Sequence, residues 1–123
     1  MNYLVVPMTV KRIVINIDTP DTARATLFYR DILGLELLMD HGWIATYGSS
    51  QQMSVQISFA TQGGSGTLTP DMSIEVEDVD AVCLAMRRAG FTIAYGPVNE
   101  PWGVRRFYVR DPFDKLVNIL AHL

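Results

Sequence analysis

The C-terminal part of the chain contains two stretches in which apolar and polar residues alternate. In residues 105–110, Arg106 and Tyr108 fall on the face opposite two apolar residues, and residues 115–121 alternate in the same way. A period of two residues is typical of a β-strand with one buried face. Residues 111–114, Asp-Pro-Phe-Asp, have the composition of a tight turn. The pattern predicts a β-hairpin whose apolar face must be covered by another element.

The first half of the chain has the pattern of a strand, a helix and three further strands. Residues 11–18 alternate with three isoleucines on one face. Thr19-Pro20-Asp21 then predicts a helix start, with Thr19 as N-cap, Pro20 at the first helical position and Asp21 in the first turn. Gly34 is expected to end that helix, because glycine adopts left-handed φ readily. The expected buried stripe of the helix is Ala25, Leu27, Phe28, Ile32 and Leu33. Short runs bounded by turn residues predict strands at 35–39, 43–47 and 53–59.

The second half repeats this order after a segment without packing periodicity. Residues 61–70 are rich in Gly, Ser and Thr and are typical of a flexible linker. A strand is expected at 72–77, a helix at 79–89 with Asp78 as its N-cap, and a strand before the final hairpin at 91–95. The chain is therefore expected to form one domain, 1–123, made of two βαβββ modules at about 11–60 and about 71–122. The predicted fold class is α+β: a curled mixed-sheet cup with helices on its outer face.

Composition narrows the possible classes of function. The chain has 123 residues, 49% of them hydrophobic, and a net charge of −3, which suits a compact domain and gives no reason to expect a nucleic-acid partner. No run approaches the roughly 18 consecutive apolar residues of a membrane span, and residues 3–10 lack the features of a signal peptide. The single cysteine, Cys83, is expected to be a buried apolar residue, and its lack of a disulfide partner fits a cytoplasmic protein.

Three segments resemble a known superfamily: FYRDILGLEL at 28–37, EVEDVDA at 75–81 and PWGVRRFYVRDPFDKLVNI at 101–119. They are similar to the glyoxalase / bleomycin-resistance / extradiol-dioxygenase (vicinal oxygen chelate) superfamily, and the third is most similar to its bleomycin-resistance branch. The resemblance implies paired βαβββ modules that form a cup, and homodimers in which both chains line each site. A homodimer is also expected because such a cup leaves strand edges and an apolar rim to be covered.

The resemblance also implies where a metal would bind. The metal-dependent members place His or Glu in the first and last strands of each module, and those positions fall here on Arg12, Gln56, Asp71 and Asn118. Arginine has no lone pair to offer, Asn and Gln are weak neutral ligands, and a single Asp does not hold a transition metal. We therefore expect no metal site and no cofactor.

The inner face of the predicted cup is too polar for a second core and suits a ligand groove. Its expected ligand-binding residues are Arg12, Trp43, Gln56, Asp71, Trp102, Arg106, Tyr108 and Asn118. Tryptophan rings suit planar or cationic ligands, and the two arginines suit a carboxylate or a phosphonate. Arg12 facing Asp71 suits an ion pair in the place of the metal, and the plainer interpretation is that each side chain points to solvent. For Arg106 and Tyr108 the plainer interpretation is an edge-strand arginine and a half-buried tyrosine, and for the two tryptophans it is strand packing.

Three hypotheses about function remain open at this point. The favoured one is a metal-free protein that binds a small molecule, such as an antibiotic, in a groove at a dimer interface. The alternative is a lyase, isomerase or dioxygenase of the same superfamily, and the third is a sensor or partner module. The sequence assigns no catalytic residue.

Overall fold

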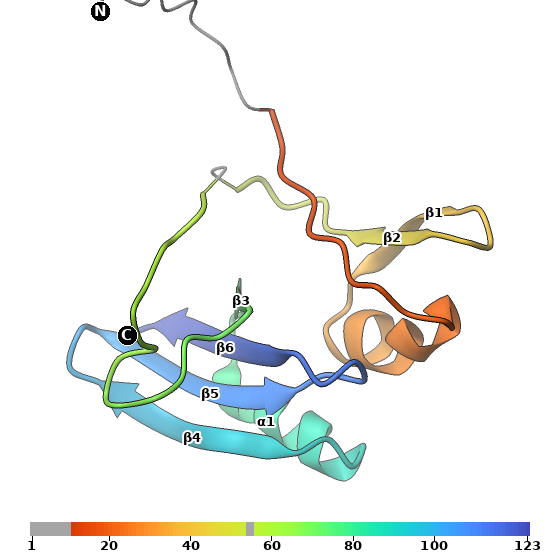
Figure 1. Ribbon diagram of the computed structural model, residues 1–123. Coiled ribbons are helices and arrows are strands. Elements are labelled where there is room, and N and C mark those ends of the chain that lie inside the picture. The colour runs from red at the N-terminus through yellow and green to blue at the C-terminus, as the bar shows by residue number, and fades with distance from the viewer. Residues whose placement is uncertain (1–10, 54–55) are drawn as a thin grey trace, which may run out of the picture.

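The computed structural model describes residues 11–53 and 56–123, and its largest element is a four-stranded sheet. The strands are β3 (Met72–Glu75), β4 (Ile93–Glu100), β5 (Val104–Arg110) and β6 (Leu116–His122). Their order is β3-β6-β5-β4, with β3 parallel to β6 and the other neighbours antiparallel. Helix α1 (Val79–Arg88) joins β3 to β4 and covers one face of the sheet (Figure 1). The strand–helix–strand–strand–strand order predicted for the second half is therefore present.

Strands β5 and β6 form the predicted hairpin, in which Tyr108 lies opposite Asn118. The Asp111 carboxylate organises the turn, because its Oδ1 accepts hydrogen bonds from the backbone N–H groups of Phe113 and Lys115, both at 2.8 Å. The apolar side of the hairpin is fully buried in the core: Phe107, Val109, Val117 and Ile119. The alternation thus assigns these residues to the correct face.

Helix α1 begins and ends close to its predicted positions. The Asp78 carboxylate accepts a hydrogen bond from the Ala81 N–H at 3.0 Å, and Gly90, with φ +88°, follows the last turn. Cys83 lies on the buried side of α1, and burial raises the pKa of its thiol. Cys83 is therefore a small apolar core residue, as predicted. In the part of the chain that the structure describes, no helix has both the length and the apolar character needed to cross a membrane.

The first half contributes a helical segment to the same core. It consists of a 3₁₀ turn, η1 (Thr22–Ala25), and a π-helical segment, η2 (Thr26–Ile32), which ends at Gly34 with φ +75° as predicted. The N-cap is Asp21 and not Thr19, since the Asp21 carboxylate accepts a hydrogen bond from the Ala23 N–H at 3.1 Å. The predicted helix start is thus placed too early.

The buried stripe of this helical segment also differs from the prediction. Phe28 is fully buried as expected, but Leu27 is 46% exposed and Tyr29 is buried in its place. The expected stripe assumed α-helical spacing, whereas the i→i+5 bonds of a π-helix place successive side chains at different angles. The Tyr29 hydroxyl donates a hydrogen bond of 2.7 Å to Asp111 Oδ2, which ties the first half of the chain to the β5–β6 turn.

Strands β1 (Glu36–Asp40) and β2 (Ala45–Gly48) form an antiparallel hairpin that is not part of the four-stranded sheet. These are the strands predicted at 35–39 and 43–47. The turn between them contains Gly42, which has φ +81° and donates its N–H to the Asp40 carboxylate at 2.9 Å. Figure 1 shows this hairpin set apart from the larger sheet.

Two further strands predicted for the first half are not strands in the structure. Residues 11–18 and 56–59 have no regular secondary structure, and residues 54–55 of the predicted 53–59 strand lie outside the described residues. Ile15, on the isoleucine face of the predicted strand, is 62% exposed. Alternation fixes which side chains share a face, but a strand also needs a partner for its backbone hydrogen bonds, and the described residues supply none to these segments. The α+β class is confirmed, whereas the division into two equal modules stays a prediction.

Candidate functional site

The structure separates the predicted ligand-binding residues into two places. Four belong to or border the sheet face opposite α1, here called the inner face: Trp102, Arg106, Tyr108 and Asn118. Two line a separate groove beside the β1–β2 hairpin: Arg12 and Trp43. Gln56 is exposed and lines neither, and the exposed Asp71 accepts the Leu116 N–H at 2.7 Å. The predicted set does not form one site within the described residues.

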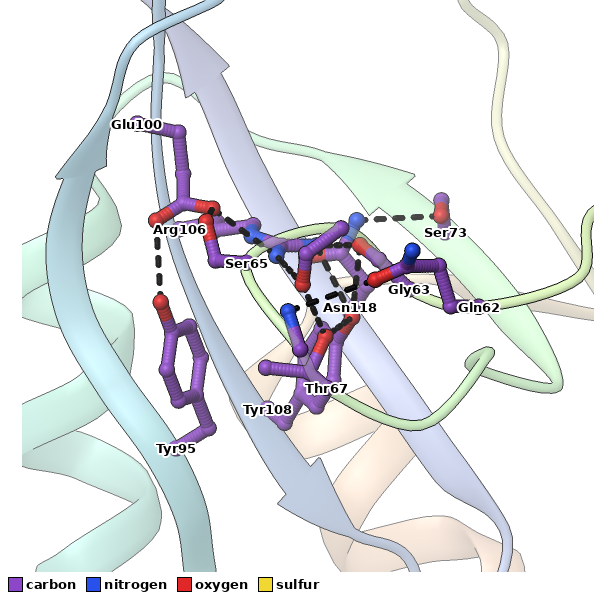
Figure 2. Close-up of polar contacts among 12 residues, drawn as sticks. Gln62, Gly63, Ser65, Thr67, Ser73, Tyr95, Glu100, Arg106, Tyr108 and Asn118 are labelled. Atoms are coloured by element: carbon purple, nitrogen blue, oxygen red, sulfur yellow. Dashed lines mark hydrogen bonds and ion pairs between the residues drawn. The ribbon is translucent and has the colours of Figure 1, made fainter.

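Arg106 lies at the centre of the inner face and is only 3% exposed. Its Nη2 pairs with Glu100 Oε2 at 2.9 Å, and its Nη1 donates to the Tyr108 hydroxyl at 2.8 Å (Figure 2). The guanidinium carbon also lies 4.9 Å from the ring centroids of Trp102 and Tyr108 and 5.4 Å from that of Tyr95. Both hydrogen bonds and aromatic faces therefore stabilise this buried cation.

Glu100 is the buried counter-ion of Arg106 and is 5% exposed. Its carboxylate accepts hydrogen bonds from the Tyr95 hydroxyl at 2.9 Å and the Ser65 hydroxyl at 2.8 Å. Burial by itself would raise the pKa of Glu100, but the hydrogen bonds from Ser65 and Tyr95 and the charge of Arg106 outweigh burial and lower the pKa. Because the carboxylate is ionised at neutral pH, the Arg106–Glu100 pair carries no net charge.

Residues 62–68 of the predicted linker, here called the glycine loop, cover the inner face. The Gly63 and Gly64 carbonyls accept hydrogen bonds from Arg106 at 2.8 and 3.3 Å, and the Thr67 and Tyr108 hydroxyls share one of 2.9 Å. A Cβ on Gly64 would lie 2.7 Å from the Trp102 ring. The glycines therefore permit close approach to the sheet, a function of glycine that the linker interpretation did not consider.

Sequence reasoning missed Tyr95, Glu100 and the contacts of the glycine loop. Glu100 lies between Pro97 and Pro101, which are typical of irregular structure, whereas β4 extends through Pro97 to Glu100 by means of β-bulges. The one available signal was the density of glycines in residues 61–70, which indicates either a flexible segment or a close backbone contact.

The second place is a groove of about 660 Å³, here called the Trp43 groove, between residues 12–19, the β1–β2 hairpin and β3. Its lining is largely apolar and aromatic, and includes Ile13, Ile15, Tyr29, Trp43, Tyr47, Ile74 and Phe113. Its polar residues are Arg12, Asn16, Asp18 and Thr19 on the N-terminal segment, Thr22 on η1 and Thr46 on β2. Trp43 is 80% exposed, so its ring is available to a ligand.

The residues present do not fit the metal centre found in metal-dependent relatives. Arg12 lines the Trp43 groove, whereas Asn118 lies on the inner face and donates from Nδ2 to the Ser73 hydroxyl at 3.1 Å. The Asp71 carboxylate is engaged by the Leu116 N–H. Within residues 11–53 and 56–123, no three His, Cys, Asp or Glu side chains lie close enough to hold an ion.

The family model described as Glyoxalase/Bleomycin resistance protein/Dioxygenase superfamily matches residues 11–119. The chain belongs to this superfamily. Membership agrees with the observed α+β architecture and with the three sequence segments that indicated it. No curated protein matches the chain significantly.

Several solved structures share this fold. TnmS3, an antibiotic binding protein from Streptomyces sp. CB03234, is 21% identical, with a TM-score of 0.65 over 98% of this chain and 100% of that one. TioX from Micromonospora sp. ML1 is 22% identical, with a TM-score of 0.60 over 92% and 97%. A superfamily member from Sphaerobacter thermophilus DSM 20745 is 22% identical, with a TM-score of 0.59 over 86% and 92%. At these identities the likeness establishes the fold.

Proposed function

We propose that this protein is a metal-free binding protein that sequesters a small, flat and largely apolar molecule in the Trp43 groove. The observation that carries the proposal is the groove itself, whose volume of about 660 Å³ and aromatic lining suit such a molecule. Pockets for drug-sized ligands usually measure about 300–1,000 Å³ and combine apolar walls with few polar groups. The antibiotic-binding relative TnmS3 supports an antibiotic-like natural product as the ligand.

The lining of the groove favours binding over catalysis. General acid–base chemistry requires titratable groups tuned to neutral pH, often as a pair. Among the described residues that line the groove, Asp18 is the single carboxylate, and no histidine, cysteine or lysine lies beside it. Burial and hydrogen bonding to Asp111 raise the pKa of Tyr29, so its hydroxyl stays neutral. Arg12 is a permanent cation, suited to orienting an electron-rich edge of a ligand. The Cys83 thiol is buried in the core and does not line the groove.

A single buried cysteine also supports a cytoplasmic location for the protein.

We also propose that two copies of the chain form a homodimer that covers the open side of the groove. Within the described residues, β3 pairs only with β6, so its other edge is available to a partner strand. Residues 11–18 and 56–59 carry exposed apolar side chains, of which Ile15, Ile57 and Phe59 are 62, 68 and 89% exposed. A second copy of the chain supplies what these segments lack, namely hydrogen-bond partners for the backbone and cover for the apolar side chains.

The groove is tested by a thermal-shift screen of planar antibiotics, followed by Trp43→Ala. A ligand at about 100 times its Kd should stabilise the wild-type protein by about 2.7 kcal/mol, and Trp43→Ala should abolish most of that shift. Trp43→Ala itself should hardly alter the melting temperature, since the side chain is mostly exposed. Leu84→Ala, at a half-exposed position on the outside of α1, is the matched control and should keep the full shift. An equal loss of the ligand-induced shift in both variants, or no loss in either, would contradict binding in the Trp43 groove.

A further inference from the structure

The glycine loop occupies the inner face in the manner of a bound ligand. Its two consecutive carbonyls, from Gly63 and Gly64, accept hydrogen bonds from Nη1 and Nη2 of Arg106. Its other attachments are hydroxyl contacts: Ser65 donates to Glu100, Thr67 and Tyr108 share one hydrogen bond, and Tyr108 also donates to the Gly63 carbonyl (Figure 2). The hydrogen bonds to Arg106 and Glu100 involve charged groups, so a molecule that replaces the loop must offer equivalent acceptors and donors.

The loop makes little apolar contact that would hold it in place. Its large apolar side chain, Leu68, is 69% exposed and so contributes little buried area. Gly64 packs against the Trp102 ring, where a flat molecule would stack equally well. The burial of apolar surface, which usually dominates the stability of a packed segment, is therefore small here.

The loop also leaves hydrogen-bonding groups of the inner face unused. Arg106 Nε and Asn118 Oδ1 are buried and have no hydrogen-bond partner, although the residues are only 3 and 8% exposed. Buried polar atoms without a partner are uncommon, because each retains the cost of losing its water. One free donor and one free acceptor thus remain on a face that the loop already covers.

The charge of the inner face selects the kind of molecule that fits it. Arg106 was expected to favour a carboxylate or a phosphonate, but its charge is matched by Glu100 at 2.9 Å. A second anion at Arg106 would lie next to the Glu100 carboxylate, and like charges at such distances repel. The carbonyls of Gly63 and Gly64 indicate that neutral acceptors satisfy the guanidinium.

We propose that the glycine loop is a displaceable internal ligand, and that the inner face beneath it binds an uncharged, flat molecule carrying two carbonyl groups. The carbonyls of an amide, imide or quinone replace those of Gly63 and Gly64 on Arg106, and the flat body stacks on Trp102. This site is distinct from the Trp43 groove and does not depend on the function proposed there.

The test compares two glycines of the loop in a Trp43→Phe background, in which Trp102 is the remaining one of two tryptophans. Gly64 and Gly66 both have positive φ, +85° and +73°, so alanine strains the backbone at either position. A Cβ at Gly64 would collide with Trp102, whereas a Cβ at Gly66 meets nothing within 4 Å. Gly64→Ala should therefore displace the loop, and Gly66→Ala is its matched control.

The probes are cyclo(Gly-Gly), a neutral flat molecule with two carbonyls, and inorganic phosphate as the anion. In Gly64→Ala, the acrylamide quenching constant of Trp102 should at least double. Cyclo(Gly-Gly) should then change the Trp102 emission with a Kd at least tenfold lower than in Gly66→Ala. Phosphate should give no saturable change in either variant.

A second variant covers the case in which Gly64→Ala does not fold. Ser65→Ala combined with Thr67→Val removes the loop's own two hydroxyls, including the bond from Thr67 to the Gly64 carbonyl within the loop, without altering a glycine. It should give the same gain in quenching and binding. Unchanged quenching in the folded variants would overturn the displaceable loop. Failure of an opened variant to bind cyclo(Gly-Gly), or tighter binding of phosphate, would overturn the neutral site.

Discussion

At the scale of single residues, Arg106 shows that the sheet face on which a side chain lies does not determine whether that side chain is buried. Alternation placed Arg106 on the inner face correctly. A side chain in an open groove contributes little to stability, but the glycine loop makes Arg106 part of a buried ion pair with Glu100. Removal of one member of such a pair leaves the other charge buried without a partner.

We expect Arg106→Ala to lower the free energy of unfolding by about 3–5 kcal/mol, the scale observed when one member of a buried ion pair is removed. The neighbouring Arg105→Ala is the control, because Arg105 pairs with the exposed Asp80 and its loss should have a small effect. Denaturant titrations of both variants measure the difference. A small effect of Arg106→Ala would indicate an open and hydrated inner face.

Glu100 should make stability depend on pH. Its pKa in the folded protein lies below the ordinary value of 4.5, so the folded state binds this proton less readily than the unfolded state. The stabilisation is therefore complete above the unfolded pKa and is lost as pH falls through the folded pKa. We expect Glu100→Gln to be less stable than wild type at pH 7, and to lose less stability than wild type between about pH 5 and pH 3. Parallel pH profiles of the two proteins would contradict this role.

At the scale of elements, the β5–β6 turn links the two halves of the chain. Asp111 Oδ1 organises the turn, while Oδ2 accepts a hydrogen bond from Tyr29 of η2. The local contact follows from the Asp-Pro-Phe-Asp sequence, because an aspartate bonds readily to backbone N–H groups two residues further on. The contact to Tyr29 does not, because it joins residues 82 positions apart.

We expect Asp111→Asn to destabilise the protein by about 1–3 kcal/mol, because an amide nitrogen cannot accept the hydrogen bond of a buried donor. Asp114→Asn, in the same turn, is the matched control: the Asp114 side chain is 90% exposed, and asparagine tolerates its φ of +60°. Thermal unfolding of the two variants gives the comparison. Equal melting temperatures would show that the Tyr29 contact contributes nothing.

At the scale of the whole molecule, the exposed apolar segments point to the proposed dimer. Light scattering at micromolar concentration should give twice the chain mass of 13.8 kDa. Ile57→Asp should shift the mass towards that of a single chain, since a charge is costly to bury in an interface. Leu84→Asp, at the half-exposed position on α1, should leave the dimer intact. A single-chain mass for the wild-type protein would refute the dimer.

The sequence by itself determined the features that depend on a few neighbouring residues. Alternation assigned the faces of β5 and β6, Asp78 and Gly90 marked the ends of α1, and the turn residues located the hairpins. These rules act over one turn or one pleat, and at these positions the tertiary contacts agree with them. The motifs at 28–37, 75–81 and 101–119 likewise indicated the superfamily to which the chain belongs.

Tertiary structure decided the features that depend on residues far apart in the chain. Residues 11–18 have the alternation of a strand but no partner among the described residues, and pairing is a property of two segments. The glycine loop has the composition of a flexible linker, yet it reaches Arg106 across 43 positions. The candidate site therefore emerged only in part from the sequence, because burial and the pairing of Arg106 with Glu100 depend on which segments meet in space.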